Sequence, residues 1–134
     1  MGRLLGLDYG TKRVGVAICD SSRLIASPYA VLEAATVLSG LDGILAAEEI
    51  EGIVVGLPVS LSGREGPVAK AARSFAEEVA AHTGVPVVMV DERFTTKVAE
   101  DVLIQGGVRR SKRRDIRDKM AATVMLQSHL DSLR

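Results

Sequence analysis

Residues 3–20, RLLGLDYGTKRVGVAICD, decide the fold, because they hold two apolar runs joined by a short polar turn. Residues 3–8 and 14–19 are predicted to be buried strands, with the turn between them. A third strand is expected near residues 24–32. Short turns between three consecutive strands predict an antiparallel meander.

The rest of the chain alternates helices with strands. Helices are predicted over residues 36–50 with Thr36 as N-cap, 67–83 closed by Gly84, 95–105 begun by Thr95 or Thr96, and 115–132; strands are predicted over residues 52–56 and 87–90. Strands that follow helical crossovers are parallel to one another. The order therefore predicts one α/β domain, residues 1–134, with a mixed five-stranded sheet of three antiparallel plus two parallel strands, flanked by helices.

Composition limits the class of protein. Apolar residues make up 47% of the chain and aromatic residues only 3%, so an aliphatic core is expected. The single cysteine, Cys19, lies in an apolar run, which favours a buried thiol and excludes an internal disulfide. The first residues resemble neither a signal peptide nor a membrane span, because Asp8 interrupts the apolar stretch. A cytoplasmic protein without a membrane partner is expected.

The charge distribution is more informative than the net charge, which is zero. Of the 17 basic residues, seven fall within residues 109–119. Such a local basic segment on a neutral domain is typical of phosphate contacts with nucleic acid. The alternative is an ordinary solvated loop and helix start.

Four acidic residues lie at strand ends or on the final helix, where a ligand site could form. Asp8 ends the first strand, Asp91 and Glu92 end the last strand, and Asp118 lies on the final helix. Parallel strands bring their carboxyl ends to one edge, where open α/β sheets bind ligands. Clustered carboxylates repel unless cations lie between them, and oxygen ligands suit Mg²⁺ or Mn²⁺. The sequence therefore predicts a divalent-metal site.

Each acid also has a structural interpretation. Asp8 could be a turn residue that accepts local hydrogen bonds. Glu92 could pair with Arg93 or Lys97. Asp118 could be a first-turn acid that the helix dipole favours.

Several residues are candidates for contacts with a phosphate backbone. The turn at Gly10, Thr11, Lys12 and Arg13 offers backbone N–H groups and cations. The other candidates are Arg93 and the basic residues Arg109, Arg110, Lys112, Arg113 and Arg114.

Four segments carry a family resemblance: GLDYGTKRVGVAICD, IVVGLP, VVMVDERFTT and IRDKMAATVMLQSHLD. Together they resemble the YqgF (RuvX) family, described as Holliday junction resolvases and as nucleases that mature the 5′ end of pre-16S ribosomal RNA. The resemblance covers nearly the whole chain, with the motifs in the family's order. It implies a ribonuclease-H-like fold.

The resemblance also implies the site residues. Asp8, Glu92 and Asp118 are expected to be the catalytic, metal-binding acids, with Asp91 a less certain neighbour. Strand alternation puts Asp91 and Glu92 on opposite faces, so one of them is the ligand, and the longer Glu92 side chain would span a two-strand gap better. Resolvases of the RuvC type carry an acid on the strand beside the first, whereas residues 53–58 here offer none.

The leading hypothesis is a metal-dependent endonuclease that cuts pre-rRNA or a four-way DNA junction. One alternative is a nucleotide-binding domain of the actin and sugar-kinase type, which needs a second domain for which this chain has no room. Another is a non-catalytic RNA- or protein-binding module that assists ribosome assembly. A homodimer would supply the two sites that a two-fold junction requires.

Overall fold

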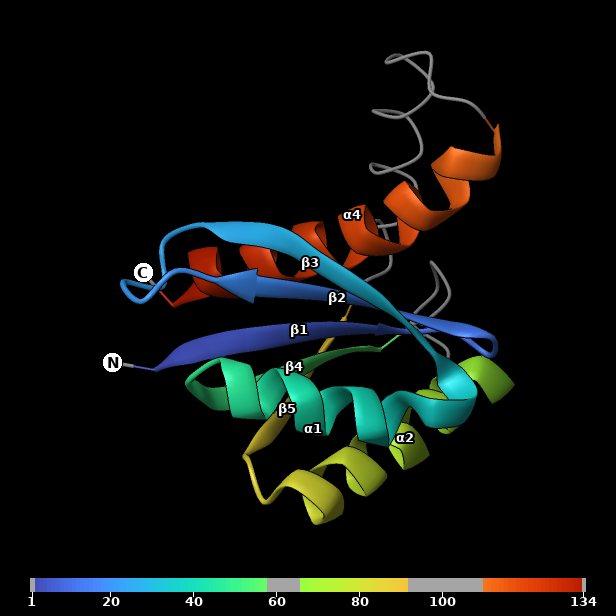
Figure 1. The fold of residues 1–134 in the computed structure, drawn as a ribbon, viewed down its shortest axis with the longest axis horizontal. Coiled ribbons are helices and arrows are strands. Elements are labelled where there is room, and N and C mark those ends of the chain that lie inside the picture. The colour runs from blue at the N-terminus through green and yellow to red at the C-terminus, as the bar shows by residue number, and fades with distance from the viewer. Residues whose placement is uncertain (1, 58–65, 92–109, 134) are drawn as a thin grey trace.

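The computed structural model describes residues 2–57, 66–91 and 110–133, with the helical backbone alone at residues 110–117. These residues form a five-stranded sheet with helices on both faces (Figure 1). The strands are β1 (Arg3–Tyr9), β2 (Arg13–Cys19), β3 (Ala26–Glu33), β4 (Ile50–Leu57) and β5 (Val87–Asp91). The helices are the 3₁₀ helix η1 (Ala34–Thr36), α1 (Val37–Ala47), α2 (Pro67–Thr83) and α4 (Arg110–Ser132).

The strand order in the sheet is β3-β2-β1-β4-β5. β2 pairs with β3 and with β1 in antiparallel fashion, whereas β4 is parallel to both β1 and β5. The predicted mixed sheet is therefore confirmed. β1 and β4 lie at its centre, and β5 lies two places from β1.

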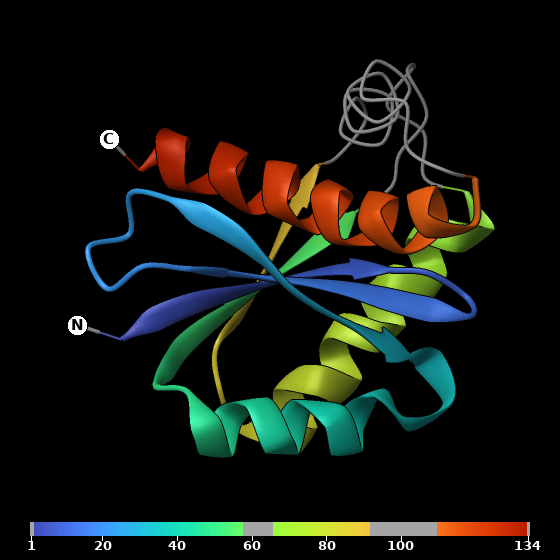
Figure 2. The same cartoon turned by 45° about the horizontal axis from the view of Figure 1, so that its top comes forward.

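α4 covers one face of the sheet, and α1 and α2 cover the other (Figure 2), with a hydrophobic core on each side. One lies against α1 and α2 and takes alternate strand residues such as Leu5, Leu7 and Val55. The other lies against α4 and takes the intervening residues, such as Leu4 and Val54. Each strand thus sends successive side chains to opposite faces, which decides where a polar residue at its end points.

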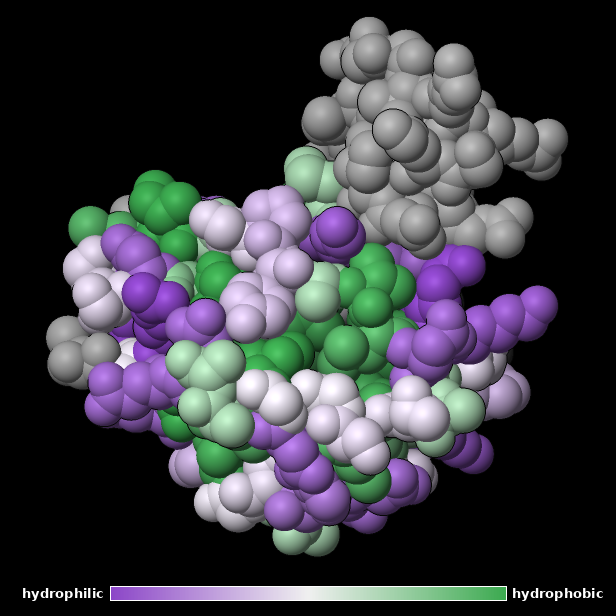
Figure 3. Space-filling model, viewed as in Figure 1, coloured by the Kyte–Doolittle hydropathy of each residue, from purple (hydrophilic) through white to green (hydrophobic). Residues whose placement is uncertain are grey.

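The surface follows from these cores. Hydrophobic side chains show at the centre of one face, over the middle of the sheet, with hydrophilic residues around them (Figure 3).

Cys19 is buried in the core beneath α4, where its sulfur accepts a hydrogen bond from the backbone N–H of Leu4 at 3.1 Å, as expected for an inert thiol. No helix in the described part of the chain has the length and apolarity needed to cross a membrane.

The third strand begins later than predicted. Leu24 and Ile25 lie in the β2–β3 turn, because Asp20 Oδ1 accepts hydrogen bonds from both of their backbone N–H groups. Arg23 has a φ of 57°, a turn conformation that breaks the extended backbone. The predicted start at residue 24 was therefore wrong by two residues.

The first helix is shorter than predicted. Thr36 precedes α1 but makes no capping hydrogen bond with its side chain, and it belongs to η1. The helix ends at Ala47, and Ile50 already begins β4. The second helix matches the prediction, with Pro67 in the first turn and Gly84 at a left-handed φ of 71° after its end.

The last helix starts earlier than predicted. α4 begins at Arg110 rather than near residue 115, so most of the basic segment is helical. The predicted helix over residues 95–105 lies outside the described residues.

Candidate active site

Asp8 lies near the carboxyl end of β1, on the face covered by α4. Its neighbours in the strand, Leu7 and Tyr9, point into the core beneath α1 and α2. Asp8 therefore points the other way and is half-buried. Its partner across the β1–β2 pair is Gly15, so Asp8 is a strand residue rather than a turn residue.

Asp118 lies on α4 directly above that partner. A Cβ placed on Gly15 would collide with the backbone carbonyl oxygen of Asp118. Residues opposite each other in an antiparallel pair have Cα atoms only roughly 4.5–5.5 Å apart. The structure thus places the backbone of Asp118 against Gly15, the strand position next to Asp8.

Small residues allow this close approach. Ala121 and Ala122 are buried on the sheet side of α4, as the sequence predicted. Gly6, two residues before Asp8, would place a Cβ 2.9 Å from Cβ of Leu126. Gly15 is the functional position that sequence reasoning missed; its signal is a glycine inside an otherwise apolar strand, which marks close backbone contact.

Arg13 forms an ion pair with Asp118. Its Nε donates to Asp118 Oδ2 at 2.8 Å, joining the start of β2 to α4. The two side chains are 27% and 24% exposed, so water screens the pair only partly. Asp118 lies well inside α4, whose first turn holds no acid, so its interpretation as a first-turn acid is wrong.

The other residues of the predicted phosphate-binding turn lie beside this pair. Thr11 and Lys12 are exposed. Gly10 is required by the tight turn, since a Cβ there would lie 2.6 Å from the carbonyl oxygen of Arg13. The Lys12 carbonyl accepts a hydrogen bond from Ala34 at 2.9 Å, which fixes the turn against η1.

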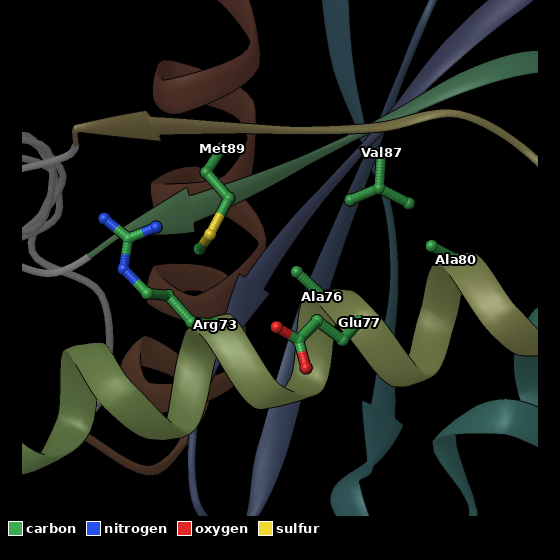
Figure 4. A pocket seen from close by; sticks show the side chains of 6 residues that line it. All are labelled: Arg73, Ala76, Glu77, Ala80, Val87 and Met89. Carbon is green, nitrogen blue, oxygen red and sulfur yellow. The ribbon is translucent and has the colours of Figure 1, made fainter.

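Asp91 lies on the opposite face from Asp8. It ends β5, is exposed, and by alternation shares the face of Val87 and Met89, which packs toward α2. That face holds a pocket of about 260 Å³, where Arg73 and Met89 point toward each other (Figure 4). The lining residues are Arg73, Ala76, Glu77, Ala80, Val87 and Met89. The structure does not bring Asp91 to the position of Asp8 and Asp118.

Some predicted site residues lie beyond what the structure describes. Glu92, Arg93 and Arg109 fall outside the described residues. For Arg110, Lys112, Arg113 and Arg114 the helical backbone of α4 is described, which places them on the turns that precede Asp118.

The described site contains two carboxylates, which could bind a metal ion, and one guanidinium, which could not. Within residues 2–57, 66–91 and 118–133, no three histidine, cysteine, aspartate or glutamate side chains group as metal ligands would. The carboxylate oxygens of Asp8 and Asp118 are of the type that a hard divalent cation prefers as ligands. Arg13 shows that this position already attracts positive charge.

Known proteins similar to this chain form one family. A family profile described as "RuvX: Holliday junction resolvase" matches residues 2–132. A Geobacillus kaustophilus protein is 43% identical over 137 residues, which cover 98% of this chain and 99% of the relative. A Zymomonas mobilis protein is 39% identical over 134 residues, which cover 98% of this chain and 82% of the relative. Both carry the name "Putative pre-16S rRNA nuclease".

Solved structures with the same fold are more distant in sequence. Thermus thermophilus RuvC in complex with a Holliday junction substrate has a TM-score of 0.59 at 15% identity, with 99% of this chain and 96% of that chain covered. Another structure of the same RuvC has a TM-score of 0.55, also at 15% identity, and covers 96% of each chain. This likeness confirms the expected ribonuclease-H-like fold. The profile match and the relatives establish that the chain belongs to the RuvX family.

Proposed function

We propose that this chain is a metal-dependent endonuclease that hydrolyses a phosphodiester bond of precursor 16S ribosomal RNA near its 5′ end. The observation that carries the proposal is that the backbone of Asp118 packs on Gly15, the cross-strand partner of Asp8 near the carboxyl end of β1. Two acidic residues 110 positions apart in the sequence thus occupy neighbouring positions on one face of the sheet, a placement that a cation bound by both carboxylates would stabilise.

A divalent ion would bind both carboxylates at once. Asp8 and Asp118 would hold Mg²⁺ or Mn²⁺, with Glu92 as the proposed third ligand. Such an ion, when bound, stabilises the negative charge that develops on the phosphate during hydrolysis. Asp91 is the weaker candidate, because it belongs to the face of the sheet that packs toward α2.

The protein's own cations would orient the substrate. Lys12 is exposed beside the acids, and the basic turns of α4 lead toward Asp118. Together with Arg93 and Arg109 they would bind backbone phosphates and place one of them at the carboxylates. Water then attacks phosphorus, and the bond from phosphorus to the leaving oxygen breaks.

Two substrates are candidates, and the similar proteins support each of them in a different way. The names of the relatives favour ribosomal RNA precursor, whereas the family profile and the fold shared with RuvC favour a four-way DNA junction. Junction cleavage is therefore the second candidate. A cytoplasmic location accords with both substrates, and a homodimer would be needed only for symmetrical junction cleavage.

One assay separates the candidates. Purified protein is incubated with 5′-extended 16S precursor RNA and with four-way DNA junctions, in Mg²⁺ and in Mn²⁺. We expect cleavage of the precursor RNA by wild type and none by Asp8→Asn, with the melting temperature of the variant measured alongside to show that it is folded.

The outcomes are distinct. Cleavage of junctions alone would move the assignment to resolution of DNA junctions. Binding of structured RNA without cleavage in either metal would favour a non-catalytic module in ribosome assembly. An Asp8→Asn variant that cuts at the wild-type rate would end the assignment of Asp8.

A further inference from the structure

We propose that Arg13 is a positioning residue, the built-in counter-cation of Asp118, which a divalent ion must displace. This inference rests on the proposed nuclease function and specifies how its metal site is controlled. Sequence reasoning placed Arg13 among the phosphate contacts. The structure instead joins its guanidinium to one of the two acids.

The contact is specific and partly shielded. Arg13 Nε and Asp118 Oδ2 lie 2.8 Å apart, and each side chain is only about a quarter exposed. Ion pairs on open surfaces contribute little, but partial burial strengthens the attraction because water screens it less. Arg13 therefore holds Asp118 at the sheet more firmly than an exposed cation would.

The contact lies on the same side of the sheet as Asp8. Arg13 and Gly15 are two residues apart in β2 and share a face. Gly15 lies beneath the backbone of Asp118 and opposite Asp8 in the β1–β2 pair. The guanidinium thus lies on the face from which a metal ion would approach the two acids.

Two cations cannot use the same carboxylate without opposing each other. A divalent ion bound between Asp8 and Asp118 would repel the guanidinium and compete with it for Asp118 oxygen. Arg13 lowers the affinity for the ion in the free protein. Once released, its planar guanidinium can bind a phosphate in bidentate fashion, so the substrate offers it a new partner.

The test is Mn²⁺ binding to the full-length protein, measured by titration calorimetry without nucleic acid. We expect Arg13→Gln to bind Mn²⁺ roughly threefold to tenfold more tightly than wild type, since a partly screened positive charge is removed. Arg13→Lys keeps the charge and should bind within about twofold of wild type. Lys12→Gln is the matched control, because it removes one exposed charge next to Arg13 and should also stay within about twofold.

A second measurement covers the case in which Arg13→Gln is poorly folded. In ¹⁵N-labelled wild type, the Nε–H resonance of Arg13, assigned by its loss in Arg13→Lys, should shift or broaden when Mg²⁺ is added.

The outcomes separate the two proposals. Unchanged Mn²⁺ affinity in Arg13→Gln, or an Nε–H resonance that ignores saturating Mg²⁺ in a protein that cleaves, would overturn the role of Arg13 alone. A wild-type protein that binds neither metal would overturn the metal-dependent function and this inference with it.

Discussion

Gly15 sets how closely α4 approaches the sheet at the candidate site. It occupies the position opposite Asp8, and the backbone of Asp118 lies where a side chain would otherwise be. A residue without a side chain therefore brings the two acids together. In the proposed site the acids would supply the chemistry, and Gly15 allows the close approach of α4.

Replacing this glycine should damage both stability and activity. Gly15→Ala places a methyl group against the Asp118 carbonyl, so α4 must shift, at a cost of about 1–3 kcal/mol in the free energy of unfolding. Because Asp118 moves with the helix, cleavage should fall as well. Urea unfolding and cleavage rates measure the two effects.

Gly43→Ala in α1 is the matched control. A Cβ at Gly43 meets nothing within 4 Å, and alanine is a better helix former. This variant should be as stable as wild type or more stable, by up to about 1 kcal/mol, with normal cleavage. A Gly15→Ala protein that matched it in stability would contradict the close packing of α4.

The sequence indicated where the acidic residues lie in the fold, but not which residues they contact. Asp8 was predicted because its position at a strand end follows from local pattern. The Arg13–Asp118 pair joins residues 105 positions apart, and local pattern carries no signal for such a contact. The face of the sheet on which Asp91 lies was known only once the register of β5 and its packing toward α2 were known.

At the scale of elements, the errors lie at the ends of strands and helices, where side-chain contacts compete with periodicity. The apolar pair Leu24 and Ile25 suggested an earlier strand start. Asp20 instead binds both backbone N–H groups and keeps them in the turn. The relative directions of the strands were predictable, because short turns join antiparallel strands and helical crossovers join parallel ones.

The β2–β3 turn should make the stability of the fold depend on pH. Hydrogen bonds from the Ser22 hydroxyl and from the backbone N–H groups of Ile25 and Leu24 lower the pKa of Asp20 to about 2. A carboxyl whose pKa is lowered by folding stabilises the fold above its unfolded pKa, near 3.9, and loses this contribution as the pH falls toward 2.

Asp20→Asn should therefore lower the melting temperature at pH 7, and the difference from wild type should shrink between about pH 4 and pH 2. Melting curves at several pH values measure it. Ser22→Ala, which removes the largest contribution to the lowered pKa, should show a smaller loss over the same range. A difference that stayed constant down to pH 2 would show that the charge of Asp20 is not involved.

At the scale of the whole molecule, the fold gathers positive charge in one region although the net charge is zero. The net charge is zero, yet the turns of α4 that lead to Asp118 carry a cluster of basic residues. The sheet then places the Gly10–Arg13 turn at the same end as the two acids. This polarity favours a negatively charged polymer approaching from one end of the sheet.

The salt dependence of nucleic-acid binding tests this polarity. A variant with Gln at Arg109, Arg110, Lys112, Arg113 and Arg114 should bind more weakly. Its slope of log affinity against log salt should fall by about 0.7–0.9 for each phosphate that the variant no longer neutralises. Arg23→Gln, which removes a cation in the β2–β3 turn at the opposite end of the sheet, should leave the slope unchanged. Equal effects from both variants would argue against a directed interface.

The central claim is that Asp8 and Asp118 act together on one phosphate. Cleavage rates of wild type, Asp8→Asn, Asp118→Asn and the double variant test it most directly. Residues that act as a unit give single losses about as large as the double loss, so each single variant should fall by more than about a hundredfold with no further fall in the double variant. Losses that multiply, or a single variant that cleaves at the wild-type rate, would contradict the account.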